Sequence, residues 1–205
     1  MRDVQRGGLG YLAINGSGCI AYDVGVGKTM TGILSIAQAM QSGMCSRPLI
    51  VVPNQTYESW LTEIGGKKDR NGEIELTGVL PQYKVNDLYN LGEKYINKLR
   101  NKKGKIVGVE ENSISIITYE GMRKLAFNEE TWEEVGRDFY KILNQGEGMS
   151  DRDRTALYDK VRMTMGHGMK DSMLEIEDLG FDFMLLDEAH NSKKVFTQVK
   201  GRMDA

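Results

Sequence analysis

The segment Gly25-Val26-Gly27-Lys28-Thr29 constrains the fold of this chain more than any other feature. It follows a short apolar run, Cys19-Ile20-Ala21-Tyr22, which predicts a buried strand, and it opens a helical pattern over residues 29–40. Glycines let a loop turn so that backbone N–H groups converge, and the N-terminus of the following helix adds partial positive charge. A strand, this loop and a helix in that order predict a site for phosphate groups.

The residue types in this segment predict individual roles. Lys28 has the reach to contact β- and γ-phosphates, and the hydroxyl of Thr29 is suited to ligate magnesium. A strict phosphate-loop pattern has glycine where this chain has Tyr22, so on its own the segment could also be a chance helix start. The expected phosphate ligands are Gly25, Val26, Gly27, Lys28, Thr29 and Met30.

A second motif lies far along the chain. The apolar run Phe183-Met184-Leu185-Leu186 predicts a strand that ends at two adjacent carboxylates, Asp187 and Glu188. Asp187 is placed to hold magnesium, and Glu188 to orient and deprotonate an attacking water. A solvated acidic turn is the alternative, but the combination with the phosphate loop favours a catalytic pair.

The remaining pattern predicts an α/β domain. Residues 49–52 and 114–118 are apolar or β-branched and predict two more strands, and helical patterns over residues 56–64 and 91–99 lie between them in the chain. Short continuous apolar strands that alternate with helices are typical of a mostly parallel sheet covered on both faces. Ligands of such sheets bind at the carboxyl ends of the strands.

Two stretches differ from this platform in charge. Residues 129–178 contain thirteen acidic and seven basic residues and show helical patterns over residues 132–143, 151–165 and 169–178. They predict an acidic helical insertion into a lobe formed by residues 1–128 and 179–205. Residues 67–105 contain ten basic and five acidic residues, which suits either a nucleic-acid-facing surface or a solvated one.

Composition excludes several other classes. The formal net charge of −2 argues against a purely electrostatic nucleic-acid binder. The two cysteines are 26 residues apart with no C-x-x-C pair, and there are only two histidines, which excludes a zinc ribbon or a disulfide scaffold. This usage suits a reducing, cytoplasmic setting, where Cys19 is expected to be a small buried residue. No apolar run approaches the ~20 residues of a membrane span, so no membrane partner is expected.

Several segments resemble a known family. Asp187-Glu188-Ala189-His190 is similar to the second motif (DEAH box) of superfamily-two helicases, and residues 21–29 resemble the phosphate loop of their Swi/Snf-like branch of DNA translocases, which lacks the early glycine. Residues 1–5 resemble the segment whose glutamine reads adenine. Two more segments resemble the next motifs of this branch. The first is residues 49–53 together with Trp60, and the second is residues 116–120. The phosphate loop and residues 47–54 also look like helicase modules of phage and mobile-element methylase–helicase proteins.

The resemblance implies a three-layer RecA-like P-loop NTPase fold and the N-terminal, ATP-binding lobe of an ATP-dependent DNA helicase or translocase. It implies ATP and Mg²⁺ as cofactors, DNA as a partner, adenine recognition by Gln5 and a coupling role for His190. It also implies a second RecA-like lobe of the same polypeptide beyond Ala205, without which hydrolysis should be very slow. The alternatives are another P-loop DNA motor, such as a restriction-type translocase or a packaging ATPase, and a nucleotide-dependent binding module without turnover.

Overall fold

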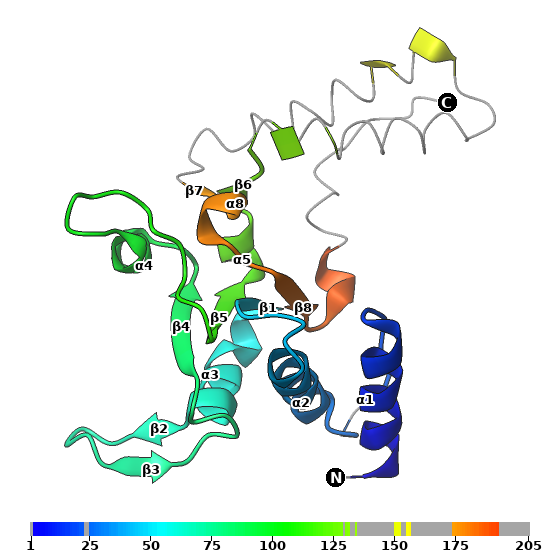
Figure 1. Ribbon diagram of the computed structural model, residues 1–205, viewed down its shortest axis with the longest axis vertical. Helices are drawn as coiled ribbons and strands as arrows, with labels where there is room; N and C mark the ends of the chain where they lie inside the picture. Colours follow the sequence, from blue (N-terminus) through cyan, green and yellow to red (C-terminus); the bar gives the residue numbers. More distant parts are fainter. Residues whose placement is uncertain are drawn as a thin grey trace.

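The computed structural model describes residues 2–22, 25–128, 130–131, 134, 150–152, 155–156 and 174–192. Its helices and strands surround one central sheet (Figure 1). In chain order they are α1 (Asp3–Asn15), α2 (Lys28–Gln41), β1 (Pro48–Val52), the 3₁₀ helix η1 (Asn54–Thr56), α3 (Tyr57–Gly65), β2 (Lys67–Lys68), β3 (Ile74–Leu76), β4 (Lys84–Tyr89), α4 (Glu93–Ile96), η2 (Asn97–Leu99), β5 (Ser113–Thr118), α5 (Tyr119–Met122), β6 (Leu125–Ala126), β7 (Leu174–Glu175), α8 (Ile176–Leu179), β8 (Phe183–Leu186) and η3 (Ala189–Ser192).

The central sheet has four strands in the order β4-β5-β1-β8, and all neighbours are parallel. β1 lies between β5 and β8, so Leu49 is paired with Ser115 on one side and with Met184 on the other. Every residue of β1 and β5 is buried, as continuous apolar runs predict. The predicted α/β class with a parallel sheet is therefore confirmed, and so are the strands predicted over residues 49–52, 114–118 and 183–186.

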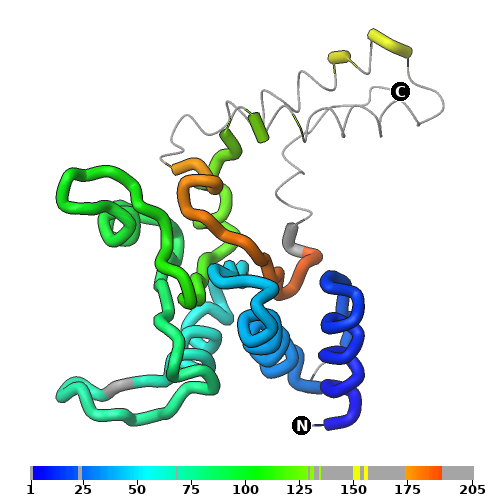
Figure 2. The backbone as a smooth tube through the Cα atoms, in the orientation of Figure 1, coloured from blue at the N-terminus to red at the C-terminus, as the bar shows by residue number. Residues whose placement is uncertain are grey.

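Side chains on the two faces of β1 belong to separate hydrophobic clusters. Ile50 and Val52 pack in a cluster with the buried faces of α2 and α3, whereas Leu49 and Val51 pack in a cluster that includes Leu179 of α8. Because successive side chains of a strand point to opposite faces, the two clusters lie on opposite sides of the sheet. The result is three layers, with the sheet in the middle (Figure 2).

α2 follows the sequence pattern closely. The helical pattern over residues 29–40 is confirmed by a helix that starts one residue earlier and ends one residue later. The apolar face of this helix is buried, with Ile33 and Ile36 fully covered. α1 lies beside α2 (Figure 1). This first helix was not predicted, because three glycines within it lower helix propensity.

The prediction of a strand over residues 19–22 is wrong. These residues are coil that lines a cleft of about 760 Å³, and β8 lines the same cleft. A strand exists only where a neighbour supplies a hydrogen-bonded ladder, and within the described ranges no ladder joins this segment to the sheet. Cys19, expected to be buried, is exposed for the same reason, whereas Cys45 is buried.

The sequence also missed the strands with little apolar content. β4 is an edge strand whose side chains are mostly half-buried, and β3, which pairs with β2 in a short antiparallel sheet, is exposed. The basic stretch 67–105 contains these strands together with α4 and η2. Whether this stretch faces nucleic acid or only solvent was left open by the sequence, and a nucleic-acid-facing surface stays a prediction.

Only parts of the acidic stretch 129–178 are described. Its last residues join the main lobe, because β7 pairs in parallel with β6 and Leu174 is buried in the same cluster as Leu179. The helix predicted over residues 169–178 is therefore wrong at Leu174 and Glu175, which form a strand that packs into this cluster. The helices predicted over residues 132–143 and 151–165 fall largely outside the described residues, and the domain boundaries stay a prediction. Within the described residues, no helix is long and apolar enough to cross a membrane.

Candidate functional site

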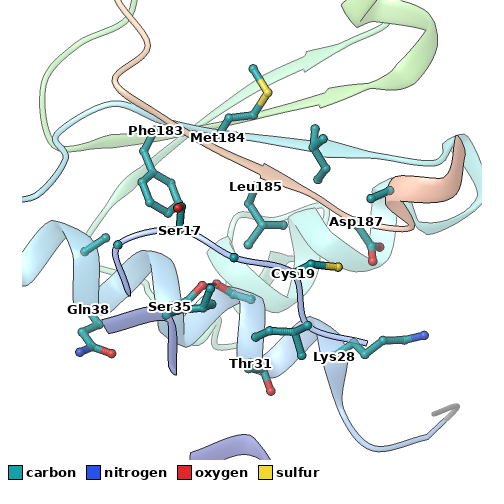
Figure 3. Close-up of a pocket in the computed structure, with 18 of the residues that line it drawn as sticks. Ser17, Cys19, Lys28, Thr31, Ser35, Gln38, Phe183, Met184, Leu185 and Asp187 are labelled. Carbon is teal, nitrogen blue, oxygen red and sulfur yellow. Dashed lines mark hydrogen bonds between the residues drawn. The ribbon is translucent and has the colours of Figure 1, made fainter. Parts of the chain in front are cut away.

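The cleft beside β8 brings together the two motifs singled out in the sequence. It is lined by α2, by residues 16–22 and by the end of β8 with the turn that follows it. In Figure 3, Lys28 and Asp187 lie toward one end of the cleft, and Phe183 and Gln38 lie toward the other. The end with Lys28 and Asp187 corresponds to the carboxyl end of β8, and parallel sheets bind their ligands at the carboxyl ends of their strands.

The phosphate loop is built on glycines that adopt conformations other residues avoid. Gly25 has φ of 79° and Gly27, the N-cap of α2, has φ of 91°. A Cβ atom on Gly27 would lie 2.4 Å from Nε2 of Gln5, so this position also lacks space for a side chain. Asp23 and Val24 fall outside the described residues.

The last turn of the loop leaves backbone donors available. The carbonyl of Gly27 accepts hydrogen bonds from the backbone N–H of Thr31, at 3.1 Å, and from its hydroxyl, at 3.2 Å. The first amides of a helix have no carbonyl one turn earlier, so those of Lys28, Thr29 and Met30 can serve a ligand. Together with the helix dipole, these groups make the N-terminus of α2 suited to an anion.

Gln5 reaches the loop from α1. Its side chain is 8% exposed, and Nε2 donates to the carbonyl of Val26 at 3.3 Å. Its Oε1 accepts from the backbone N–H of Arg2, whose guanidinium Nη1 donates to the carbonyl of Gly25 at 3.3 Å. The structure therefore places Gln5 against the phosphate loop, and α1 is tied to the loop at two points.

Asp187 is held by three neighbouring elements. Its backbone N–H donates to the carbonyl of Val51 in β1 at 2.9 Å. Its backbone carbonyl accepts from the hydroxyl of Tyr119 in α5 at 2.7 Å, and its carboxylate Oδ2 accepts from the indole Nε1 of Trp60 in α3 at 2.8 Å. Trp60 is buried, and neither its hydrogen bond to Asp187 nor that of Tyr119 was predicted from the sequence.

Glu188 lies between Lys28 and His190 in an unusual backbone conformation. Its Oε1 is 3.6 Å from Nζ of Lys28, and its Oε2 is 3.2 Å from Nδ1 of His190. Its φ of 52° is in the left-handed region, which costs a residue with a Cβ about 1–2 kcal/mol. Strained residues persist where the surroundings over-determine them, and they cluster at functional sites.

The hydroxyl of Tyr119 is kept in its protonated form. Burial, followed by the negative charges of Asp187 and Glu188, raises the pKa of Tyr119 to about 12. The group is therefore a hydrogen-bond donor throughout the neutral range, as its contact with the carbonyl of Asp187 requires.

The donors present fit magnesium. The described part of the chain contains no cluster of three or more His, Cys, Asp or Glu side chains that could hold a metal. Magnesium is usually bound by one or two carboxylates together with substrate phosphates and water, rather than by a protein cage. The carboxylate of Asp187 and the hydroxyl of Thr29 are oxygen ligands of this kind.

The chain matches a known protein family. A family model described as the SNF2-related domain matches residues 11–201, which is most of the chain and includes both motifs of the cleft. A search of curated proteins found no match. Gln5 lies before the first matched residue.

Proposed function

Since the chain belongs to the SNF2-related domain family, we propose that it is the ATP-binding lobe of an ATP-dependent DNA helicase or translocase, which couples ATP hydrolysis to movement on, or remodelling of, nucleic acid. One observation carries the proposal. Lys28 of the phosphate loop and Glu188 at the end of β8, far apart in sequence, form an ion pair of 3.6 Å at the cleft.

The proposal assigns the phosphates of ATP to the N-terminus of α2. The backbone amides from Gly25 to Met30 would bind their oxygens, and Nζ of Lys28 would reach the β- and γ-phosphates. Thr29 and Asp187 would hold magnesium, which neutralises charge on these phosphates when it is bound. Gln5, beside the loop, would contact adenine.

Glu188 is proposed to act on the attacking water. In the structure its carboxylate is engaged by Lys28 and faces His190. When ATP binds, Lys28 would exchange Glu188 for the γ-phosphate, and the released carboxylate would then accept a proton from water. The ion pair thus keeps the base occupied until the substrate is present.

His190 is proposed to couple the site to the surface. Its side chain is 66% exposed, while its Nδ1 lies 3.2 Å from the carboxylate of Glu188. A residue that touches both solvent and the catalytic carboxylate is suited to sense a nucleic acid or a second lobe docked over the cleft.

Calorimetry with Mg·ADP and Mg·ATP tests the proposed site. The wild-type chain should bind both, and Lys28→Ala should lose binding, because this lysine supplies the side-chain charge that faces the phosphates. Lys84→Ala, which removes an exposed lysine paired with Glu110 at 2.7 Å, is the matched control and should bind like wild type. Equal heats for wild type and Lys28→Ala would reject the assignment. Phosphate release measured with and without duplex DNA then tests the motor class.

A further inference from the structure

The indole of Trp60 makes a contact that packing alone does not require. The ring is 2% exposed and packs in the core under β1, yet its one N–H group points to a carboxylate oxygen of Asp187 at 2.8 Å. A buried indole N–H needs an acceptor. Here the acceptor is the acid that the proposed function assigns to magnesium.

This contact engages only one of the two carboxylate oxygens of Asp187. Oδ2 is engaged by Trp60, and among the described residues no side chain donates to Oδ1. The backbone on either side of the carboxylate is also fixed, by Val51 at the N–H and by Tyr119 at the carbonyl. A carboxylate anchored at one oxygen and at its backbone can offer the other oxygen to a cation in a defined direction.

Trp60 also contacts the helix that begins at the phosphate loop. A Cβ atom on Gly32 of α2 would lie 3.0 Å from Cη2 of Trp60 and 3.1 Å from Cδ1 of Leu185 in β8. The glycine therefore allows α2, the indole and β8 to meet closely. Trp60 is the side chain at which the helix of the phosphate loop, α3 and the strand of Asp187 converge.

We propose that Trp60 is a positioning residue for the magnesium ligand, in which the Nε1–H group fixes Asp187 so that the carboxylate is oriented before metal and nucleotide bind. This inference rests on the proposed function. It predicts a role in metal-dependent nucleotide binding beyond the contribution of Trp60 to the core.

The test compares ADP affinity with and without magnesium. Trp60→Phe keeps a large aromatic ring and removes the N–H group. It should leave ADP affinity in EDTA unchanged and reduce the gain in affinity from magnesium by about tenfold, as expected for loss of one hydrogen bond to a charged group. Tyr57→Phe is the matched control, because it removes a partly buried hydrogen bond from the same helix, to Asp87 at 2.6 Å, without touching Asp187.

The outcomes separate the inference from the proposed function. An unchanged magnesium gain in folded Trp60→Phe, or an equal loss in Tyr57→Phe, would overturn the positioning role while leaving nucleotide binding intact. If wild type binds no ADP in either condition, the proposed function fails, and this inference fails with it.

A measurement on the wild-type chain covers the case in which Trp60→Phe does not fold. The indole N–H resonance of Trp60 should be protected from hydrogen exchange in the metal-free protein and should shift when magnesium is added to the ADP complex. In Asp187→Ala it should lose that protection and no longer respond to magnesium. A resonance that exchanges equally fast in both proteins would contradict the proposal.

Discussion

Nζ of Lys28 lies 3.6 Å from Oε1 of Glu188, so the lysine of the phosphate loop and the acid at the end of β8 partly neutralise each other. Both side chains are a little more than one-third exposed, which makes the pair weak enough for a phosphate to displace. The pair therefore joins the two motifs without closing the cleft.

Removing the carboxylate should strengthen nucleotide binding. Glu188→Gln takes away a competitor for Lys28 and a negative charge beside the phosphates, so Mg·ADP affinity should rise by up to about fivefold, the scale of an exposed ion pair. Calorimetry measures it, with Glu110→Gln, which breaks the exposed pair with Lys84, as the control that should not change. Weaker binding by Glu188→Gln would mean that the carboxylate does not compete for Lys28.

The left-handed conformation of Glu188 should be visible in stability. Glycine adopts φ of 52° without the steric cost of a Cβ, so Glu188→Gly should be more stable than Glu188→Ala by about 1 kcal/mol. At Gln38, an exposed position inside α2, the order should reverse and alanine should be the more stable. Urea unfolding of the four variants checks this. If the alanine variant were more stable than the glycine variant at both positions, the backbone of Glu188 would not be strained.

Two glycine substitutions should have opposite effects. Gly32→Ala places a methyl group against Trp60 and Leu185, and overpacking of this kind costs about 1–3 kcal/mol. Gly7→Ala in α1 meets no atom within 4 Å and should stabilise the protein by about 0.5–1 kcal/mol through helix propensity. Urea unfolding again gives both values. A neutral Gly32→Ala would indicate that α2 and β8 can move apart freely.

Acid stability should depend on Asp182. Burial alone would raise the pKa of Asp182, but hydrogen bonds from the backbone N–H groups of Ser46 and Arg47 and from the hydroxyl of Ser46 outweigh it and lower the pKa. A depressed pKa in the folded state stabilises the fold above the ordinary aspartate value of about 4, and this stabilisation is lost as the pH falls through the folded-state pKa.

Asp182→Asn should therefore be less stable than wild type at neutral pH, and the difference should narrow below about pH 4. Ser46→Ala, which removes one donor, should show a smaller difference with the same pH dependence. Unfolding curves recorded from pH 7 to pH 3 test this, and a difference that is independent of pH would exclude the ionised carboxylate as its cause.

The strands buried on both faces could be predicted from sequence, because continuous apolar runs are typical of parallel strands that are covered on both faces. The segment 19–22 is also a short apolar run, but it is not a strand. An apolar run alone does not specify whether a neighbouring strand is present to pair with it. β4 was missed for the opposite reason, because its edge position tolerates polar residues.

The acids and the phosphate loop could be singled out from sequence because the chemistry proposed for them requires particular residues next to one another in the chain. The hydrogen bond from Trp60 to Asp187 was not, because a sequence does not record which distant acceptor a buried N–H group will meet. The one available signal was the indole itself, which requires a partner wherever it is buried.

The position of β1 between β5 and β8 sets an order of events during synthesis. The chain is made from its N-terminus, so the phosphate loop and β1 leave the ribosome long before β8 and its acids do. Until β8 pairs with β1, one edge of β1 is unpaired and Glu188 cannot meet Lys28. The cleft can therefore form only after β8 has docked, and the long-range closure of β8 onto β1 is the step that should limit folding.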